Sequence, residues 1–286
     1  MSFPVKKASG LKLINRRKNI SKRKERKLKK AISLLENRQF CVITGAGVST
    51  ASGIPDYRGM GSAPKKPLNF DPFMKSEEYR KDFWADGYQD WIDFSPAQPN
   101  GAHLAIAELQ NTGFVNGVIT QNVDDLHFVD EQQVVAELHG NMYTTSCLSC
   151  GHIYATSYII EKLELGNPSL LTNTVDRENF WIPNCEQCTG IIKPDVVFFG
   201  EGIPSHGYDL ATEIAKDAQG VVVAGTSMNV MTPYPFVQMM RQRGNPVIVI
   251  NKGKTMVDDL ADVKIDMDIS EAFATINQEL TSVVYI

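Results

Sequence analysis

Short apolar runs recur along the chain, and most of them end at a glycine or a polar residue. They are FCVIT at 40–44, GVIT at 117–120, DVVFFG at 195–200, GVVVAG at 220–225 and PVIVIN at 246–251. Apolar runs of this length without alternation predict strands that are buried on both faces. Amphipathic stretches with three- and four-residue spacing, typical of helices, lie at 22–36, 102–110 and 208–218. Buried strands that alternate with helices predict an α/β fold with a doubly wound parallel sheet.

Two segments interrupt this alternation. Residues 60–100 are rich in aromatic, proline and charged residues, so we expect an irregular and then helical insert over a ligand cleft, although plain core packing would give the same aromatic pattern. Residues 141–190 contain two Cys-x-x-Cys pairs. The expected domains are therefore a leader at 1–30, one large α/β domain at 31–140 and 191–286, and a small inserted domain at 141–190.

The composition, with 43% hydrophobic and 22% charged residues, predicts a soluble globular protein. The chain has neither an apolar run of the ~20 residues that cross a bilayer nor a secretory signal pattern. Five cysteines, four of them in close pairs, favour a reducing compartment over a disulfide framework. We therefore expect a bacterial cytoplasmic protein, with the mitochondrial matrix as the alternative.

Charge is distributed unevenly along the chain. Residues 1–30 hold 13 of the 29 Lys and Arg and 1 of the 33 acids, which leaves 16 basic and 32 acidic residues for the rest. The leader is either a solvated, partly helical extension, an organellar presequence, or a segment that contacts an acidic partner, nucleic acid or a membrane surface. The acidic body argues against nucleic acid as the main ligand.

The cysteine pairs predict a metal site. The pairs are Cys147 with Cys150 and Cys185 with Cys188, and a glycine follows each pair closely. Four thiolates match the tetrahedral preference of zinc and leave no open position, so the predicted zinc is structural. The 34 residues between the pairs exceed the usual ~15–20, and a helix near 158–165 is expected to fill the gap. Redox dithiols or chance pairs are the alternatives, and Cys41 is expected to be a buried apolar filler.

A glycine turn, TGAGVSTASGIPDYRG at 44–59, follows the first predicted strand. A dinucleotide fingerprint reads G-x-G-x-x-G, but here Thr50 takes the third glycine position and the next glycine is Gly53. The next strand ends in TQN, which offers no acid to a ribose. These features disfavour a dehydrogenase, although the backbone amides of such a turn can still bind a phosphate.

The stretch GAGVSTASGIPDYRG resembles the first signature of the sirtuins, the NAD-dependent protein deacylases. Further family motifs follow in the family's order: TQNVDDLH at 120–127, ELHG at 137–140, the cysteine pairs, KPDVVFFGE at 193–201, GTSMNV at 225–230 and VIVIN at 247–251. The resemblance covers about residues 30–280 and is greatest to the mitochondrial-type, class II branch, because of the long gap between the cysteine pairs and the YRKDFWADGYQDW insert. It implies a Rossmann-like NAD-binding domain with a small zinc module inserted.

The resemblance also implies that NAD is consumed as a co-substrate rather than reduced. The carbonyl oxygen of an acyl-lysine attacks C1′ of the nicotinamide ribose, nicotinamide leaves, and the products are free lysine and 2′-O-acyl-ADP-ribose. Such a reaction needs a general base near the ribose hydroxyls, and His139 in ELHG matches the family's catalytic histidine. Asn122 and Asp124 match the residues that hold the nicotinamide carboxamide.

The remaining NAD contacts are implied by position in the same motifs. The diphosphate is expected to meet Gly45, Ala46, Gly47 and Arg58, with further phosphate contacts from Gly225, Thr226 and Ser227. The nicotinamide side is expected to include Ile54, Pro55, Asp56 and Tyr57, the last at a position where the family usually has Phe. Gln121 is expected at the nearer ribose, Asn251 at the adenine-side ribose and Ile269 at the adenine. Ser49, Gly53 and Val123 complete the expected set.

The implied partner is an acyl-lysine protein or peptide. It is expected to add a strand beside Phe199, Gly200 and Glu201, with Val197 and Phe198 lining an acyl tunnel, although VVFF also reads as a buried strand. The chain departs from the family at Asp125, where glycine is usual, and at FVDE in 128–131. Two other functions therefore stay open, an NAD-dependent protein ADP-ribosyltransferase and a non-catalytic zinc-containing interaction module.

Overall fold

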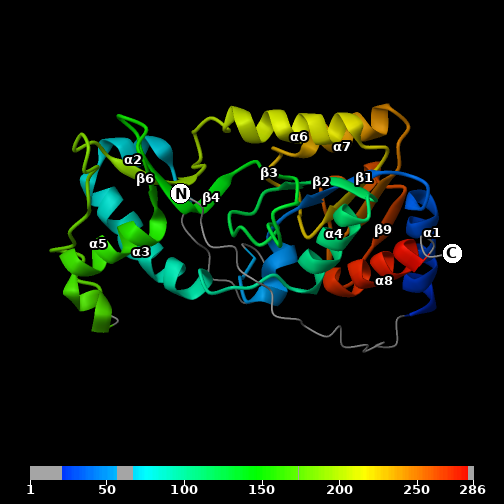
Figure 1. The fold of residues 1–286 in the computed structure, drawn as a ribbon, viewed down its shortest axis with the longest axis horizontal. Coiled ribbons are helices and arrows are strands. Elements are labelled where there is room, and N and C mark those ends of the chain that lie inside the picture. Colours follow the sequence, from blue (N-terminus) through cyan, green and yellow to red (C-terminus); the bar gives the residue numbers. More distant parts are fainter. Residues whose placement is uncertain (1–20, 57–66, 173, 283–286) are drawn as a thin grey trace.

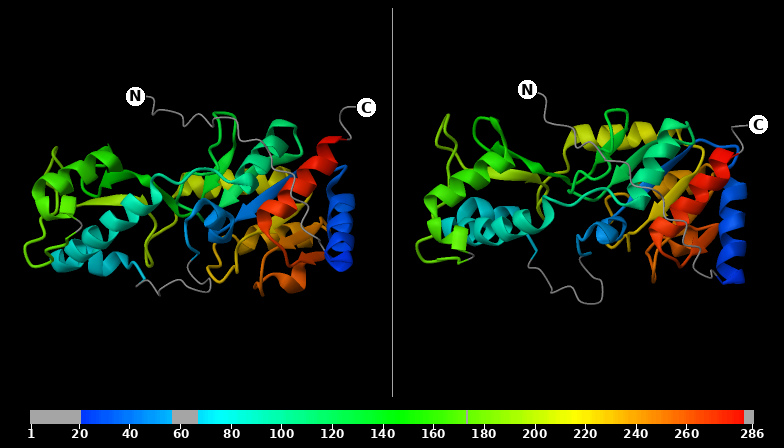
Figure 2. Two further views of the ribbon diagram at one scale, coloured as in Figure 1. Left: turned by 90° about the horizontal axis from the view of Figure 1, so that it is seen from below. Right: turned by 60° about the horizontal axis from the view of Figure 1, so that its bottom comes forward.

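The structure is a computed structural model that describes residues 21–56, 67–172 and 174–282. Most of the leader, Tyr57 and Arg58 lie outside these residues. The described chain forms two lobes, with the large sheet in one and the cysteine pairs in the other (Figures 1 and 2). Among the described helices, none is both long and apolar enough to cross a bilayer.

The large lobe contains a six-stranded parallel sheet in the order β3-β2-β1-β7-β8-β9. Its strands are β1 (Phe40–Thr44), β2 (Val115–Thr120), β3 (Val135–Glu137), β7 (Val221–Ala224), β8 (Val247–Ile250) and β9 (Val263–Ile265). The chain builds outward from β1 to β3 and then crosses to β7 on the other side of β1. This reversal between β1 and β7 is a topological switch point, where open α/β sheets bind ligands at the carboxyl ends of their strands. The predicted doubly wound α/β fold is confirmed.

Helices cover both faces of this sheet (Figure 1). One face packs on α1 (Lys22–Leu35), α4 (Gly101–Asn111) and α8 (Ile269–Ser282), and the other on α6 (Ser205–Asp217) and α7 (Tyr234–Gln242). In β7, Val222 and Ala224 point into the first core, whereas Val221 and Val223 point into the second. This double burial explains why the strands read as continuous apolar runs.

The small lobe contains a three-stranded antiparallel sheet in the order β5-β4-β6. Its elements are β4 (Gly140–Cys147), β5 (Ile153–Ala155), α5 (Thr156–Gly166), the 3₁₀ helix η2 (Pro168–Thr172) and β6 (Ile192–Val196). The helix expected near 158–165 is confirmed as α5. The prediction that DVVFFG belongs to the parallel sheet is wrong, because β6 pairs with β4. A buried run does not reveal which sheet it joins.

The aromatic insert supplies the helical cover of this small sheet. It forms α2 (Phe70–Lys75) and α3 (Glu77–Phe94). Trp84 and Tyr88 of α3 are buried in one cluster with Ile159 and Leu163 of α5 and with the sulfur of Cys185. The buried aromatic residues of α3 are therefore core residues of the small lobe.

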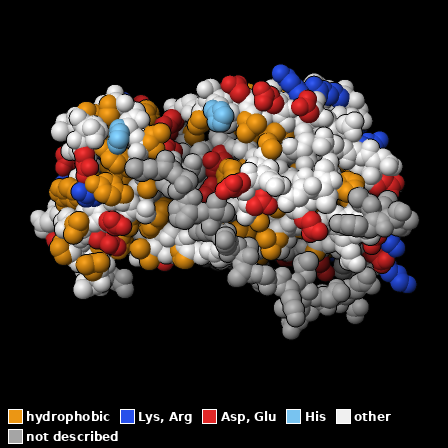
Figure 3. All heavy atoms as spheres, viewed as in Figure 1, with side chains coloured by type: hydrophobic (Ala, Val, Ile, Leu, Met, Phe, Trp, Pro, Cys, Tyr) orange, Lys and Arg blue, Asp and Glu red, His pale blue; other side chains and the backbone are white. Residues whose placement is uncertain are grey.

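The surface agrees with the charge pattern of the sequence. On the face in Figure 3, acidic side chains are spread over the large lobe, whereas Lys and Arg gather toward its outer end.

The two remaining elements are the 3₁₀ helices η1 (Ala46–Ser52) and η3 (Asp258–Leu260). The first of them follows β1 directly, at the carboxyl edge of the sheet.

Candidate active site

The glycine turn after β1 packs tightly on the turn after β7. The Gly47 amide donates to the Gly225 carbonyl at 2.9 Å, and the Gly45 amide donates to the Ala224 carbonyl at 3.2 Å. A Cβ on Gly47 would lie 2.9 Å from Gly225 Cα, and Gly225 itself has a φ of +65°. Both positions therefore require glycine. The amides of Gly45 and Gly47 are engaged inside the protein, so they are not the free donors to a diphosphate that the resemblance implies.

A buried polar cluster joins this turn to the end of β2. The Ser49 hydroxyl donates to Asp124 Oδ2 at 2.5 Å, and Asn122 Nδ2 donates to Ser49 Oγ at 3.0 Å. The Leu126 amide donates to the other oxygen of Asp124 at 3.1 Å. Burial raises the pKa of Asp124, against the opposing effect of these donors. The structure thus brings together Asn122 and Asp124, the two residues expected at the nicotinamide carboxamide, with Ser49, which was expected at the cofactor.

A second set of buried polar groups contacts this cluster through Asn122. Thr44 Oγ1 donates to Thr120 Oγ1 at 2.9 Å and lies 2.8 Å from His127 Nε2, while Thr120 Oγ1 accepts from the Asn122 amide at 3.0 Å. His127 contacts the ring of His103, with centroids 4.8 Å apart. Burial lowers the pKa of both imidazoles, that of His103 to about 4. These two histidines are therefore neutral structural residues.

His139 follows β3 at the same edge of the sheet. Its Nδ1 lies 3.1 Å from the Gln121 carbonyl oxygen, and its Nε2 lies 3.2 Å from Thr232 Oγ1. A carbonyl only accepts, so Nδ1 carries the proton and Nε2 keeps its lone pair. Burial lowers the pKa of His139, and the Gln121 carbonyl opposes that effect. The ring is thus neutral and basic at Nε2 near neutral pH, as a general base must be.

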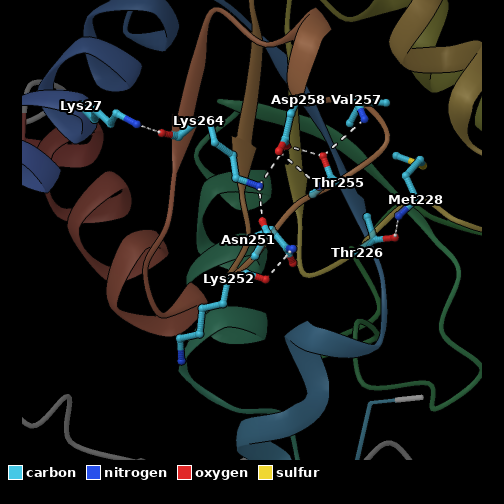
Figure 4. Close-up of polar contacts among 10 residues, drawn as sticks. Lys27, Thr226, Met228, Asn251, Lys252, Thr255, Val257, Asp258 and Lys264 are labelled. Atoms are coloured by element: carbon cyan, nitrogen blue, oxygen red, sulfur yellow. Dashed lines mark hydrogen bonds and ion pairs between the residues drawn. The ribbon is translucent and has the colours of Figure 1, made fainter. Parts of the chain in front are cut away.

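Two residues expected at the cofactor, Thr226 at a phosphate and Asn251 at the adenine-side ribose, follow β7 and β8 (Figure 4). The Asn251 amide donates to the Ile265 carbonyl at 3.1 Å, and its side chain donates to the Lys252 carbonyl. Lys264 of β9 reaches across to the Gly253 carbonyl at 2.8 Å and to Asp258 Oδ1 at 3.0 Å. Asp258 in turn accepts from the Thr255 hydroxyl at 2.5 Å. This network holds the loop after β8 and thereby Asn251.

Other residues expected at the cofactor lie along the same edge. The Ile269 side chain borders Gly225, because a Cβ on that glycine would be 2.8 Å from Ile269 Cδ1. The carbonyl groups of Val123 and Ser227 accept from Met142 and Met256. Gly53 ends the turn at a φ of +89°, and it is followed by Ile54, Pro55 and Asp56, the last residues described before the gap.

The predicted substrate segment differs from expectation at two residues. The Phe199 amide donates to the Leu68 carbonyl at 2.8 Å, and the Phe199 carbonyl accepts from the Phe70 amide at 3.0 Å. The chain's own segment thus occupies the Phe199 backbone, and strand addition there is excluded in this conformation. Phe198 is 2% exposed and packs on Phe73 and on Phe83 of α3, so it is a core residue.

Of the other substrate-segment residues, Val197 contacts the candidate base through its backbone, whereas Glu201 contacts Lys193. The Val197 amide donates to the His139 carbonyl at 2.9 Å. Glu201 pairs with the buried Lys193 at 3.2 Å and accepts from the Phe198 amide, which shapes the turn around Gly200. Val197 and Glu201 also line a groove of about 520 Å³ between β6 and the start of α6.

The four cysteines converge in the small lobe. Their Sγ atoms all lie within 4.8 Å of one another, with Cys147 and Cys188 3.5 Å apart and Cys150 and Cys185 3.7 Å apart. Zinc–sulfur bonds of ~2.3 Å in a tetrahedron require sulfur atoms about 3.8 Å apart. The amides of Ser149 and Cys150 point at Cys147 Sγ, and the Tyr154 hydroxyl lies 3.2 Å from Cys185 Sγ. The donor set fits a structural zinc, with four protein ligands and no position for substrate.

Comparison with known proteins identifies the family. The family model described as "Sir2 family" matches residues 45–232. The chain belongs to the Sir2 family. An NAD-dependent protein deacetylase 1 of Mycobacterium avium is 35% identical over 87% of this chain and 94% of its own length. A mitochondrial sirtuin-4 of Bos taurus, named an NAD-dependent protein lipoamidase, is 33% identical over 89% of this chain and 86% of its own length.

Solved sirtuin structures resemble this one closely. A complex described as "Sir2-p53 peptide-NAD+" has a TM-score of 0.75 and 31% identity, covering 88% of this chain and 98% of the other. The predicted family and its Rossmann-like fold with an inserted zinc module are thus confirmed. The sirtuin-4 relative agrees with the predicted mitochondrial-type branch.

The departure of this sirtuin at Asp125 has a visible backbone cost. Asp125 adopts a φ of +61°, in the left-handed region that favours glycine. Asp tolerates that region better than most residues. The substitution therefore keeps the shape of the TQNVDDLH turn and adds a negative charge next to Asp124.

That charge acts on Glu137. Burial first, and then Asp125, raises the pKa of Glu137 to about 8. A carboxyl whose pKa is raised by folding stabilises the folded state below its unfolded value near 4.5, and this contribution is lost as pH rises toward about 8. We therefore expect Glu137→Gln to leave stability unchanged at pH 4.5 and to increase it at pH 8, by an amount of order 3 kcal/mol after discounting for partial exposure.

Urea unfolding at both pH values measures this difference. Glu213→Gln, an exposed carboxylate on α6, is the matched control and should change neither value. Equal unfolding midpoints of wild type and Glu137→Gln at pH 8 would show that folding does not raise the pKa of Glu137.

Proposed function

We propose that this sirtuin is an NAD-dependent protein-lysine deacylase. The observation that carries the proposal is His139, whose neutral ring is held by the Gln121 carbonyl with Nε2 as the basic nitrogen, at the carboxyl edge of the sheet. A solved Sir2 structure is described as a complex with 2′-O-acetyl-ADP-ribose and a deacetylated p53 peptide. The same chemistry here would give nicotinamide, free lysine and 2′-O-acyl-ADP-ribose.

The residues of the chain divide the work. NAD supplies the ribose carbon that receives the acyl oxygen and nicotinamide as the leaving group. The buried side chains of Asn122 and Asp124, held by Ser49, bind and orient the nicotinamide carboxamide. His139 accepts the proton of a ribose hydroxyl at Nε2 and is most effective when neutral.

The rest of the cofactor lies across the switch point. Thr226 and Ser227 meet phosphate at the end of β7, and Asn251 meets the adenine-side ribose at the end of β8. Ile269 at the start of α8 borders the adenine. Arg58 and Tyr57 belong to the same proposed site, although they lie outside the described residues.

The protein partner presents an acyl-lysine. It pairs with the backbone at Gly200 and Glu201, and the acyl group passes Val197 on its way to His139. Thiolate ligands persist in a reducing compartment, which favours a bacterial cytoplasm or a mitochondrial matrix. The contact between the leader and an acidic partner concerns mainly residues 1–20, which lie outside the described part of the chain.

Incubation with NAD and a panel of acyl-lysine peptides, resolved by mass spectrometry, tests the proposal. We expect nicotinamide, free lysine and 2′-O-acyl-ADP-ribose in equal amounts for at least one acyl group. ADP-ribose attached to protein without acyl transfer would instead identify a protein ADP-ribosyltransferase. No nicotinamide release with any peptide would exclude both activities.

A further inference from the structure

The loop after β7, residues 226–232, forms hydrogen bonds with two groups that the proposed reaction needs, the side chain of Gln121 and Nε2 of His139. Thr226 Oγ1 donates to Gln121 Oε1 at 2.7 Å, and Gln121 Nε2 donates to the Val230 carbonyl at 3.0 Å. Thr232 Oγ1 lies 3.2 Å from His139 Nε2. The side chain expected at the ribose and the candidate base are therefore both paired with one loop of the chain itself.

The contact of Nδ1 of His139 determines which group donates in the hydrogen bond between Thr232 and Nε2. The Gln121 carbonyl can only accept, so the proton of neutral His139 is on Nδ1. Nε2 then has one lone pair, and Thr232 must donate to it. A substrate hydroxyl needs that same lone pair in order to give up its proton.

We propose that the Thr232 hydroxyl is a placeholder at His139. It donates to Nε2 in the position that a ribose hydroxyl of the substrate will take, and it leaves Nε2 when that hydroxyl arrives. The proposal rests on the proposed function. No family motif marks Thr232, because its role depends on a contact across 93 positions of the chain.

Gln121 links the release of Thr232 from His139 to cofactor binding. Both ends of its amide are bonded to the loop, so a ribose that binds Gln121 must loosen the tie to Val230 or to Thr226. Either change frees the segment that carries Thr232. The ligand that needs the base thus also releases it.

The hydrogen bond that is lost on NAD binding predicts how a Thr232 variant changes the affinity for NAD. On binding, the wild type gives up the hydrogen bond between Thr232 and Nε2, whereas a variant without the hydroxyl has none to give up. A neutral hydrogen bond contributes enough to change an equilibrium about threefold to tenfold. Thr232→Val keeps the shape of the side chain and removes the donor, and Thr232→Ser keeps the donor.

Calorimetric titration of the full-length protein with NAD is the decisive measurement. We expect Thr232→Val to lower the Kd for NAD about threefold to tenfold, which is an effect on binding. Thr232→Ser should behave as wild type. Thr275→Val, which removes a hydroxyl on α8 that bonds only within its helix, is the control and should change nothing.

Two results overturn the proposal. One is a folded Thr232→Val with NAD affinity equal to or weaker than wild type, and the other is a loss of affinity or of kcat in Thr232→Ser. Should Thr232→Val not fold, Thr232→Ala is measured against the same two criteria. Wild type that fails to bind NAD at all contradicts the proposed function instead, and so the two failures are distinguishable.

Discussion

His139→Ala is expected to reduce the formation of 2′-O-acyl-ADP-ribose by about 10²–10⁴-fold, the usual contribution of a positioned general base. The structure gives the reason, since the Gln121 carbonyl holds Nδ1 and makes Nε2 the basic nitrogen, whose lone pair passes from Thr232 to the substrate hydroxyl. Binding of NAD should change little, because the buried Ser49, Asn122 and Asp124 cluster does not include His139. The measurement is product formation by mass spectrometry under saturating NAD and peptide.

A second reaction separates the base from the rest of the site. Attack of the acyl oxygen on the ribose carbon removes no proton, so exchange of labelled nicotinamide into NAD should survive in His139→Ala. His206→Ala removes an exposed imidazole at the start of α6 and serves as the control. Deacylation by His139→Ala within about tenfold of wild type would place the base elsewhere.

Much of the site could be predicted because linear motifs carry it. Asn122 and His139 each lie two residues after the end of a buried strand, and Asp124 lies four residues after the end of β2. In a parallel sheet the carboxyl ends of such strands meet at one edge. The cysteines were predictable for a similar reason, since a pair at Cys-x-x-Cys spacing already places two ligands on one turn.

The sequence could not predict the contacts between segments that are distant along the chain. The segment from Leu68 to Phe70 occupies the backbone of Phe199, and Thr232 reaches His139. Nothing in the local pattern of these residues reports the pairing. The network of Lys264 and Asp258 was missed for the same reason, because charged pairs at the surface have no distinctive spacing.

The fold, too, was predictable where it depends on the local sequence and not where it depends on contacts between distant segments. Periodicity predicts buried strands but not their partners. It therefore places the run at 195–200 in the parallel sheet, whereas the first residues of that run pair antiparallel with β4. The motif predicts that the glycines of the turn after β1 approach a phosphate. The structure adds a constraint that the motif does not report, the close approach of the turn after β7, to which the amides of Gly45 and Gly47 donate.

Loss of the zinc site is the second change with a large expected effect. Cys185→Ala removes one of four converging thiolates, and we expect zinc content to fall from one per chain to none. Cys147 and Cys185 are buried in the same cluster as Trp84 and Tyr88. Structural zinc contributes about 10–16 kcal/mol in peptides that have little other core. This lobe has an aromatic core as well, so a loss of order 5 kcal/mol and unfolding of the small lobe are expected.

Activity should fall together with the zinc, even though the metal has no open position. β4 begins directly after His139, and β6 leads into Val197, whose amide donates to the His139 carbonyl. An unfolded small sheet therefore releases one side of the candidate base. Metal analysis, hydrogen exchange of 140–196 and deacylation are measured on the same sample.

Cys41→Ala supplies the matched control, because Cys41 is fully buried in β1 and burial raises the pKa of its thiol to about 12. It should keep the zinc, the protection of the small lobe and the activity, at the cost of a small local loss of packing. Cys185→Ala with a full complement of zinc would mean that the other three thiolates hold the metal alone. If instead the zinc were lost while deacylation stayed at the wild-type rate, the small sheet would have no part in holding His139, and the link from β4 and β6 to the site would be wrong.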